Sequence, residues 1–298
     1  MPTPSTVIKA SRLTVCANSR ELLTGVNATI LAGSSTVLIG RTGSGKSAFL
    51  ETALGLRPRQ SGEIETLGLD PQDPKSAIRI RQQCGVVPQD KTLYGNFSVE
   101  EMCRFTRAFY PLWQDHLESR LLDRFNLRPH SKVRDLSPAR RTLLTATLAM
   151  AHAPRILILD KPFDDLDPGS NHDLLQALVE AASEEGVALI VATNSPERMH
   201  TVADYAIFFR NGEAVASVSI ESVTREWRLV TARFVRPTVL SSLPINGIEH
   251  SRVESQLAEW VVSQSSGARE LATMLSALGA VSVQTEPMSL TTLVSRFV

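Results

Sequence analysis

The sequence predicts an α/β fold built on a parallel sheet with helices on both faces, and three observations support it. A buried, β-branched segment at 36–39 leads into a glycine-rich turn and then into an apolar helical stretch from Ala48. Four aliphatic residues at 156–159 end at Asp160. From Arg155 onward, strand-like and helix-like stretches alternate, as they do in βαβ units.

The glycine-rich turn matches the phosphate-binding pattern G-x-x-x-x-G-K-[ST]. Its eight residues are Gly40, Arg41, Thr42, Gly43, Ser44, Gly45, Lys46 and Ser47. Between a strand and a helix, such a loop lets backbone N–H groups converge on phosphate oxygens, and the helix N-terminus adds a positive dipole end. Lys46 would reach the β- and γ-phosphates, and the Ser47 hydroxyl would bind Mg²⁺. The segment therefore predicts a nucleoside triphosphate site.

Asp160 stands at the C-terminal end of a predicted buried strand. In open α/β sheets this edge is where ligands bind. A carboxylate there can hold magnesium directly or through water. The alternative is an ordinary aspartate that caps the next turn, but the loop at Gly40 favours the magnesium role.

With both motifs placed, the chain resembles the ATP-binding subunits of ABC transporters from about Val7 to Glu213. Three further segments carry the resemblance, Ser61-Gly62-Glu63-Ile64, Gly85-Val86-Val87-Pro88-Gln89 and Asp165-Leu166-Asp167-Pro168. The resemblance implies a P-loop NTPase core of the ABC ATPase type, with a parallel sheet, an antiparallel β subdomain and a helical subdomain.

The resemblance also implies the cofactors ATP and Mg²⁺ and assigns further site residues. Gln89 takes the Q-loop position, whose glutamine senses magnesium, and Asp167 lies in the D-loop. The implied ATP-binding set is the eight-residue loop with Ala48 and Gln89. The implied magnesium ligands are Ser47, Gln89 and Asp160.

Two domains are expected. Residues 1–218 would form the ABC-type ATP-binding domain, with a helical subdomain at about 93–152 that resembles bacterial exporter subunits whose permease is a separate chain. Residues 219–298 would form a small C-terminal α+β accessory domain. Its strands are predicted at 227–234, 255–263 and 281–285, and its helices at 267–278 and 290–297.

Four positions depart from the family. Lys161 replaces the glutamate that follows the magnesium aspartate, and Asn194 replaces the switch histidine. Ala17 stands where an aromatic ring stacks on adenine. The signature L-S-G-G-Q reads Leu136-Ser137-Pro138-Ala139-Arg140. Because a charged lysine cannot accept a proton from water, these degenerate positions predict weak or absent ATP hydrolysis and leave the enzymatic status open.

Two interpretations of Lys161 remain open from the sequence. In one, the side chain lies against the γ-phosphate and holds ATP uncleaved. In the other, it extends into solvent or pairs with Asp164 or Asp165, and the missing glutamate is the whole effect. Asp164 acting as a substitute base is a third reading, which its position one turn further along disfavours.

The altered signature opens a predicted helix that, in the family, faces the γ-phosphate of the partner subunit's ATP. Ser137 can cap this helix and offer a hydroxyl. Pro138 suits the first helical position but removes one N–H, whereas Ala139 keeps its own. Arg140 adds positive charge that could compensate. The alternative is the plain start of a surface helix.

Composition limits the partners. Lys+Arg and Asp+Glu both number 31, so no overall basic field favours nucleic acid. We expect no membrane-spanning run and no secretory leader, so a membrane role would come through a partner. Cys16, Cys84 and Cys103 are scattered, which favours reduced cytosolic thiols.

The predicted function is that of an ABC transporter ATP-binding subunit, cytoplasmic and peripheral on the inner face of the cell membrane, that powers or regulates transport through a separate membrane permease. A homodimer would lack the glutamate at both sites, which favours a heterodimer with a second, intact ABC ATPase subunit. The alternatives are a soluble regulatory ABC-type protein and a small-molecule P-loop kinase. In this family the membrane partner sets the transported substrate, and the sequence indicates a direction only through its resemblance to exporter subunits.

Overall fold

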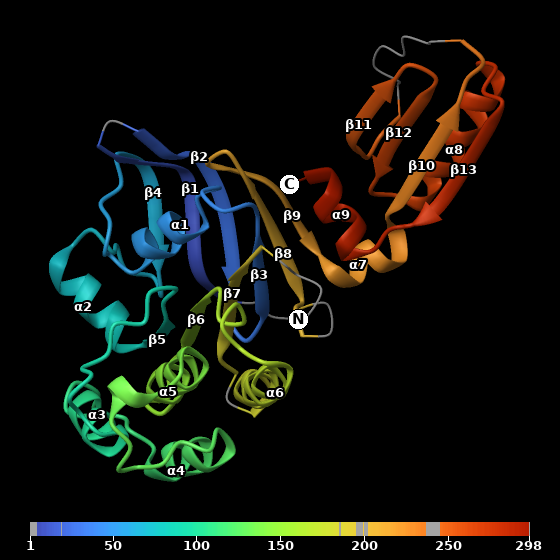
Figure 1. The fold of residues 1–298 in the computed structure, drawn as a ribbon. Coiled ribbons are helices and arrows are strands. Elements are labelled where there is room, and N and C mark those ends of the chain that lie inside the picture. The colour runs from blue at the N-terminus through green and yellow to red at the C-terminus, as the bar shows by residue number, and fades with distance from the viewer. Residues whose placement is uncertain are drawn as a thin grey trace. The chain divides into compact units, whose positions relative to one another are not determined.

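The computed structural model describes residues 5–18, 20–184, 186–194, 199, 202–236 and 245–297. The chain divides into two compact units with a border between Ser217 and Val218. The predicted domain border, between residues 218 and 219, lies one residue further along. Figure 1 shows the elements of each unit.

The first unit contains the predicted parallel sheet, with strand order β5-β6-β7-β3-β8-β9. Strands β5 to β8 pair in parallel. Asn211 and Gly212, both with positive φ, join β8 to β9 in a two-residue hairpin turn. Each residue of β3, β6 and β7 is buried, as strands covered on both faces require. The strands are β3 Ser35–Ile39, β5 Cys84–Val87, β6 Ile156–Asp160, β7 Ala188–Thr193, β8 Tyr205–Arg210 and β9 Glu213–Ser219.

A second, antiparallel sheet has the order β2-β1-β4. Its strands are β1 Thr6–Ala17, β2 Arg20–Leu31 and β4 Ser61–Thr66. Helix α1 (Lys46–Ala53) contacts all three strands. On its other side, Phe49 packs against Phe209 of β8 with ring centroids 5.6 Å apart. This shared apolar core fixes the start of α1, and therefore the glycine-rich loop, against the edge of the parallel sheet.

Helices of the first unit flank the sheet (Figure 1). They are α2 Pro74–Gln82, α3 Val99–Arg107, α4 Asp115–Arg124, α5 Pro138–Met150 and α6 Pro168–Glu184, with a 3-10 turn at Val133–Asp135. Helix α5 contacts β5 closely, because a Cβ on Gly85 would lie 2.1 Å from the Ala149 carbonyl oxygen. Helices α3, α4 and α5 occupy the stretch predicted as helical. No helix among the described residues is long and apolar enough to cross a membrane.

The second unit is a four-stranded antiparallel sheet with α8 packed on one face. Leu271 and Leu275 of α8 share a core with Val230 and Trp260. The elements are α7 Ile220–Glu226, β10 Arg228–Arg233, β11 Ile248–Glu254, β12 Leu257–Val262, α8 Ser265–Ala277, β13 Ser282–Pro287 and α9 Leu290–Phe297. The sequence did not predict α7 or β11. Strand β11 lies at a sheet edge and is mostly exposed and polar, so it lacks the apolar alternation that marks a strand.

Candidate functional site: a phosphate-binding pocket

The glycine-rich loop joins β3 to α1, and its backbone needs glycine at two points. Gly45 has φ +108°, in the left-handed region that side chains avoid. A Cβ on Gly40 would lie 2.3 Å from the carbonyl oxygen of Phe209 in the neighbouring strand. The loop can therefore turn tightly between the sheet and the helix only with these residues.

Lys46 is 4 % exposed, and its ammonium lies within the loop itself. Its Nζ donates to the carbonyl oxygens of Gly40 (2.5 Å) and Arg41 (3.0 Å) and to Ser44 Oγ (3.3 Å). The pKa of Lys46 is lowered to about 8, mainly by burial and also by the charge of Lys161, while Asp160 opposes the fall. Lys46 is therefore a protonated, buried cation at neutral pH.

Asp160 and Ser47 meet at the carboxyl edge of the sheet. Ser47 Oγ donates to Asp160 Oδ2 at 2.5 Å, which joins the end of β6 to the first turn of α1. The second oxygen, Asp160 Oδ1, is buried and has no hydrogen-bond partner. Such an orphaned acceptor is costly unless a ligand satisfies it.

The glycine-rich loop and the start of α1 line a pocket of about 240 Å³. The lining comprises Leu22, Thr42, Gly43, Ser44, Gly45, Lys46, Ser47, Ala48, Glu51, Arg57, Gln89 and Lys161. Most of the predicted ATP-binding residues therefore line this pocket. Leu22, Glu51 and Arg57 were not predicted. Glu51 lies one helical turn after Ser47, so the spacing on α1 could have revealed it.

Lys161 lies at the end of β6, is 8 % exposed, and turns its side chain to this pocket. Its backbone has φ +50°, and its N–H donates to the Ala192 carbonyl oxygen at 2.9 Å. Asp165 pairs instead with Lys91 (2.9 Å), and Asp164 is exposed and does not line the pocket. The structure therefore does not show the ion pairs that the sequence left open for Lys161.

Asn194, at the end of β7, connects two parts of the loop. Its Nδ2 donates to Thr42 Oγ1 at 3.1 Å, and its Oδ1 accepts from Lys46 Nζ at 3.2 Å. The predicted switch position thus reaches the loop in this fold. Its neighbour at position 195 lies outside the described residues.

The remaining predicted residues lie away from this pocket. Ser137 caps α5 by accepting from the Arg140 N–H (3.3 Å), with Pro138 at the first helical position. Ser137, Pro138 and Arg140 are exposed, and Ala139 is half-buried. Asp167 Oδ1 accepts from two N–H groups at the start of α6, both at 3.0 Å. The Ser170 hydroxyl, which donates to Asp167 Oδ2 at 2.7 Å, and then these N–H groups lower the pKa of the Asp167 carboxyl.

A second pocket is an apolar groove of about 390 Å³ in the same unit. Leu54, Leu56, Arg81, Cys84, Val86, Pro88, Leu93, Met102, Thr106, Tyr110, Thr145, Leu148, Ala149 and His152 line it. His152 is 3 % exposed and stacks on Tyr110, with ring centroids 3.9 Å apart. Its Nδ1 has no hydrogen-bond partner, and burial lowers its pKa to about 4. The imidazole is therefore neutral at physiological pH.

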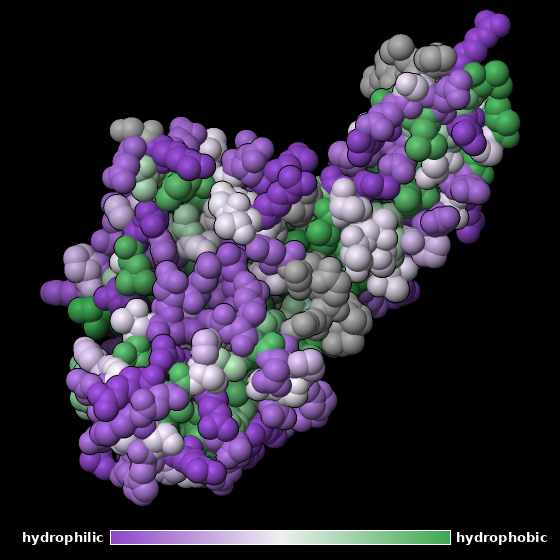
Figure 2. Space-filling view, viewed as in Figure 1, coloured by the Kyte–Doolittle hydropathy of each residue, from purple (hydrophilic) through white to green (hydrophobic). Residues whose placement is uncertain are grey.

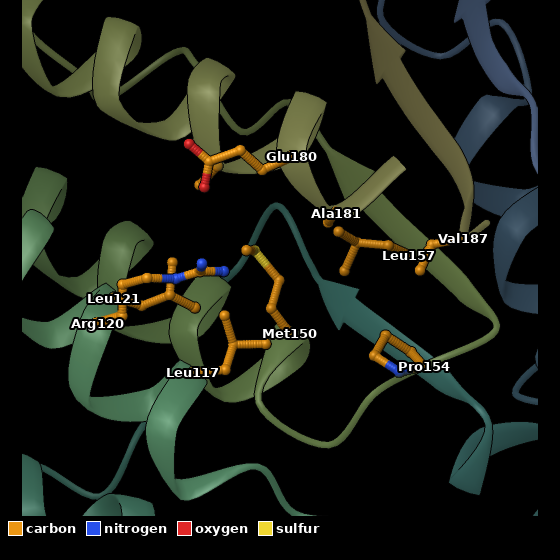
Figure 3. A pocket seen from close by; sticks show the side chains of 10 residues that line it. Leu117, Arg120, Leu121, Met150, Pro154, Leu157, Glu180, Ala181 and Val187 are labelled. Carbon is orange, nitrogen blue, oxygen red and sulfur yellow. The ribbon is translucent and has the colours of Figure 1, made fainter. Parts of the chain in front are cut away.

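A third cavity lies between α4, α5, α6 and β6 (Figure 3). Leucine, methionine, valine and alanine side chains dominate its wall, and its volume is about 10 Å³. That volume holds about one water molecule, so it is a packing defect and not a ligand site.

Comparisons with known proteins agree with this geometry. The profile of the family described as "ABC transporter" matches residues 23–164. The chain is 22% identical over 228 residues to the ABC transporter ATP-binding protein YtrB of Bacillus subtilis (strain 168), which covers 76% of this chain and 77% of that protein.

Solved structures show the same fold. One ATP-binding subunit of an ABC transporter has a TM-score of 0.67 at 25% identity and covers 74% of this chain and 92% of its own. The dimeric ATP-binding cassette MJ0796, bound to ADP and Pi, has a TM-score of 0.64 at 21% identity and covers 71% and 98%. The first unit is thus an ABC ATPase cassette of the P-loop NTPase fold, and this chain contains an ATP-binding domain of the ABC transporter family.

Proposed function

We propose that this chain is the ATP-binding subunit of an ABC transporter, that it powers or regulates transport through a separate membrane permease, and that its own residues hydrolyse ATP weakly or not at all. The observation that carries the proposal is a phosphate-binding loop that lines a pocket together with Lys161, which stands where the family has its glutamate.

The pocket offers no free carboxylate to accept a proton from water. Glu51 is the acidic side chain of the described lining, and it pairs with Arg57 at 2.6 Å. Lys161 is a cation, and the Asn194 amide is neither acid nor base. Loss of both the base and the switch residue lowers the hydrolysis rate on the order of a hundredfold or more.

Magnesium fits this donor set. Within the described part of the chain, no three His, Cys, Asp or Glu side chains form a metal cage by themselves. Mg²⁺ instead favours one or two protein oxygens together with phosphates and water. Ser47 Oγ, the orphaned Asp160 Oδ1 and the Gln89 side chain would hold the ion. When bound, it would neutralise phosphate charge.

A second ATPase subunit follows from the exposed signature. Ser137 caps an exposed helix start by accepting from the Arg140 N–H, and neither residue lines this chain's own pocket, so both could meet another subunit's nucleotide. The dimeric cassette of the same fold supports such an assembly. A partner with an intact glutamate would use these residues for its own turnover, so we favour a heterodimer.

The apolar groove is the surface that fits a permease segment. The rings of Tyr94, Phe97, Phe105 and Phe109 form an aromatic cluster with centroids 5.2 to 5.6 Å apart, and the three contacts of Phe105 are edge-to-face. Tyr94 is 58% exposed and Phe109 is 60% exposed. The viewed face of the first unit is otherwise mainly hydrophilic, with separate apolar patches (Figure 2). Exposed apolar patches of this kind mark interaction sites.

The proposal places the protein in the cytoplasm, peripheral on the inner face of the cell membrane through the permease. Residues 219–298 would serve as an accessory α+β domain. The soluble regulatory ABC-type protein is the alternative that the first experiment must separate.

Affinity purification of the tagged full chain from detergent-solubilised membranes tests the partners. A membrane permease and a second ABC ATPase that carries the glutamate are expected in stoichiometric amounts. A variant in which serine replaces Phe109, a member of the exposed aromatic cluster, tests the proposed surface. We expect this variant to lose the permease while it retains the second ATPase. Recovery of the chain without any membrane protein would favour the soluble alternative.

ATP turnover of the purified complex tests the missing base. Lys161→Glu restores a carboxylate at the end of β6, so we expect turnover to rise on the order of a hundredfold in the site formed by this chain. Lys161→Gln is the matched control without a base and should remain slow. Wild-type turnover that is fast, and no slower than that of Lys161→Glu, would refute weak hydrolysis.

A further inference from the structure

Lys161 lines the pocket, and its ammonium has no partner within the described part of the chain. The residue is 8 % exposed, and no hydrogen bond or ion pair joins its Nζ to the described residues. The Nζ keeps some exposure to the pocket, where an unpaired ammonium attracts anions. A lysine kept in this state points to an anion that is supplied from outside the chain.

The backbone fixes where this cation lies. Lys161 has the left-handed φ of +50°, which a residue with a Cβ adopts at a cost of about 1 kcal/mol. Its N–H is held by the Ala192 carbonyl oxygen of β7 at 2.9 Å. The turn therefore directs the side chain to the pocket wall instead of letting it follow the chain into solvent.

The nearby carboxylates do not neutralise it. Asp165 is paired with Lys91, Asp164 is exposed, and Glu51 is paired with Arg57. Asp160 Oδ2 accepts from Ser47 Oγ at 2.5 Å. The pocket consequently holds two ammonium groups, and the carboxylates near it do not balance both positive charges.

The second ammonium, Lys46, lies within electrostatic range. Lys46 and Lys161 both line the same pocket, Lys46 in the glycine-rich loop and Lys161 directly after β6. Two like charges that share one pocket repel each other, and a polyanion between them relieves this repulsion. A triphosphate carries one more phosphate group than a diphosphate, so it gains more from the second cation.

We propose that Lys161 binds the terminal phosphate of ATP, makes the pocket selective for ATP over ADP, and retains the uncleaved nucleotide as a long-lived structural ligand of the assembly. This inference rests on the proposed function, because it requires that the pocket holds a nucleoside triphosphate. It adds that the lysine is a binding residue and not merely the absence of a base.

Calorimetric titration of the full chain with MgATP and with MgADP at pH 7 tests the inference. Lys161→Met keeps the length of the buried side chain and removes its charge. We expect its MgATP affinity to fall about tenfold or more while MgADP affinity changes less than about threefold. Lys161→Arg should retain the preference for ATP. Lys75→Met, on the exposed surface of α2, is the matched control and should behave as wild type.

Release of fluorescent ATP after mixing with excess unlabelled ATP provides a second readout. Retention predicts that Lys161→Met shortens the bound lifetime by about the same factor as the loss of affinity, because affinity differences within one site lie mostly in the dissociation rate. The melting temperature without nucleotide, measured for each variant, identifies any that are misfolded, and Lys161→Gln then replaces Lys161→Met.

The outcomes separate the two proposals. If the folded wild-type chain binds neither nucleotide, the proposed function fails. If it binds both and the ratio of MgADP to MgATP dissociation constants is unchanged in Lys161→Met, the proposed function stands and the role of Lys161 is overturned. A collapse of that ratio, with Lys161→Arg restoring it, establishes the terminal-phosphate contact.

Discussion

Lys46 and His152 are almost equally buried, at 4 % and 3 % exposed, yet they occupy opposite kinds of pocket. Lys46 Nζ has four hydrogen-bond acceptors, three from its own loop and one from Asn194. His152 Nδ1 has none in the structure and lies against the ring of Tyr110. One group keeps its charge at neutral pH, whereas the other loses it.

The difference shows that burial alone does not decide ionisation. Desolvation is the largest cause in both cases. The pKa of Lys46 falls from 10.5 to about 8, with Lys161 adding to the fall and Asp160 opposing it. The pKa of His152 falls from 6.5 to about 4, so a similar shift leaves the lysine charged and the imidazole neutral at pH 7. The pocket around Lys46 thus suits an anion, and the groove around His152 suits an apolar partner.

The largest expected effect comes from removing the charge of Lys46. Lys46→Met keeps the side-chain length but takes away the cation that reaches the β- and γ-phosphates. We expect MgATP affinity to fall on the order of a hundredfold, measured by calorimetry. His152→Gln, equally buried and in the same unit, is the matched control and should change affinity less than about twofold. Equal losses in both variants would contradict the division between the two pockets.

The second effect concerns acid stability through His152. Its folded pKa of about 4 lies below the unfolded value of 6.5, so the unfolded state binds more protons between these values. The free energy of unfolding that depends on a neutral His152 is therefore fully present above pH 6.5 and is lost as the pH falls toward 4. The loss amounts to about 1 to 2 kcal/mol at pH 5. The other titratable groups that line the groove with His152 are Tyr110, Cys84 and Arg81.

Urea unfolding at pH 7.5 and pH 5 measures this term. Wild type should lose more unfolding free energy between the two pH values than His152→Gln does. His130→Gln, at a side chain that is 93% exposed, is the matched control and should keep the wild-type difference. If His152→Gln shows the wild-type pH dependence, the neutral imidazole is not what the groove buries.

The smallest effect concerns the helix that forms one wall of the groove. Ser98 Oγ accepts from the Glu101 N–H at 3.1 Å, and Glu101 Oε2 accepts from the Ser98 N–H at 2.6 Å. Ser98→Ala removes this cap of α3 and should lower the free energy of unfolding by about 1 kcal/mol. Ser119→Ala, on an exposed turn of α4, should cost less. A cost at Ser98 no larger than that at Ser119 would show that the cap does not stabilise α3.

Local patterns predicted most of the first unit because each was backed by a strong periodic or motif signal. Aliphatic runs such as Ile156–Asp160 have few alternatives to a buried strand, and the loop at Gly40 has demanding backbone needs. The second unit was harder. Its edge strand β11 is polar and mostly exposed, and the short α7 carries little apolar signal, so neither stands out along the sequence.

The sequence alone determined the phosphate-binding loop, the aspartate at the strand end and the replacement of the expected acid by Lys161, because these depend on residue identity at fixed spacing. Only the tertiary structure decided where the Lys161 side chain goes, since that depends on the left-handed turn after β6 and on Lys91 and Arg57 holding the neighbouring carboxylates. It likewise decided that His152, remote from any motif, lies buried beside Tyr110. Such placements arise from contacts between segments far apart in the chain, and no local pattern encodes them.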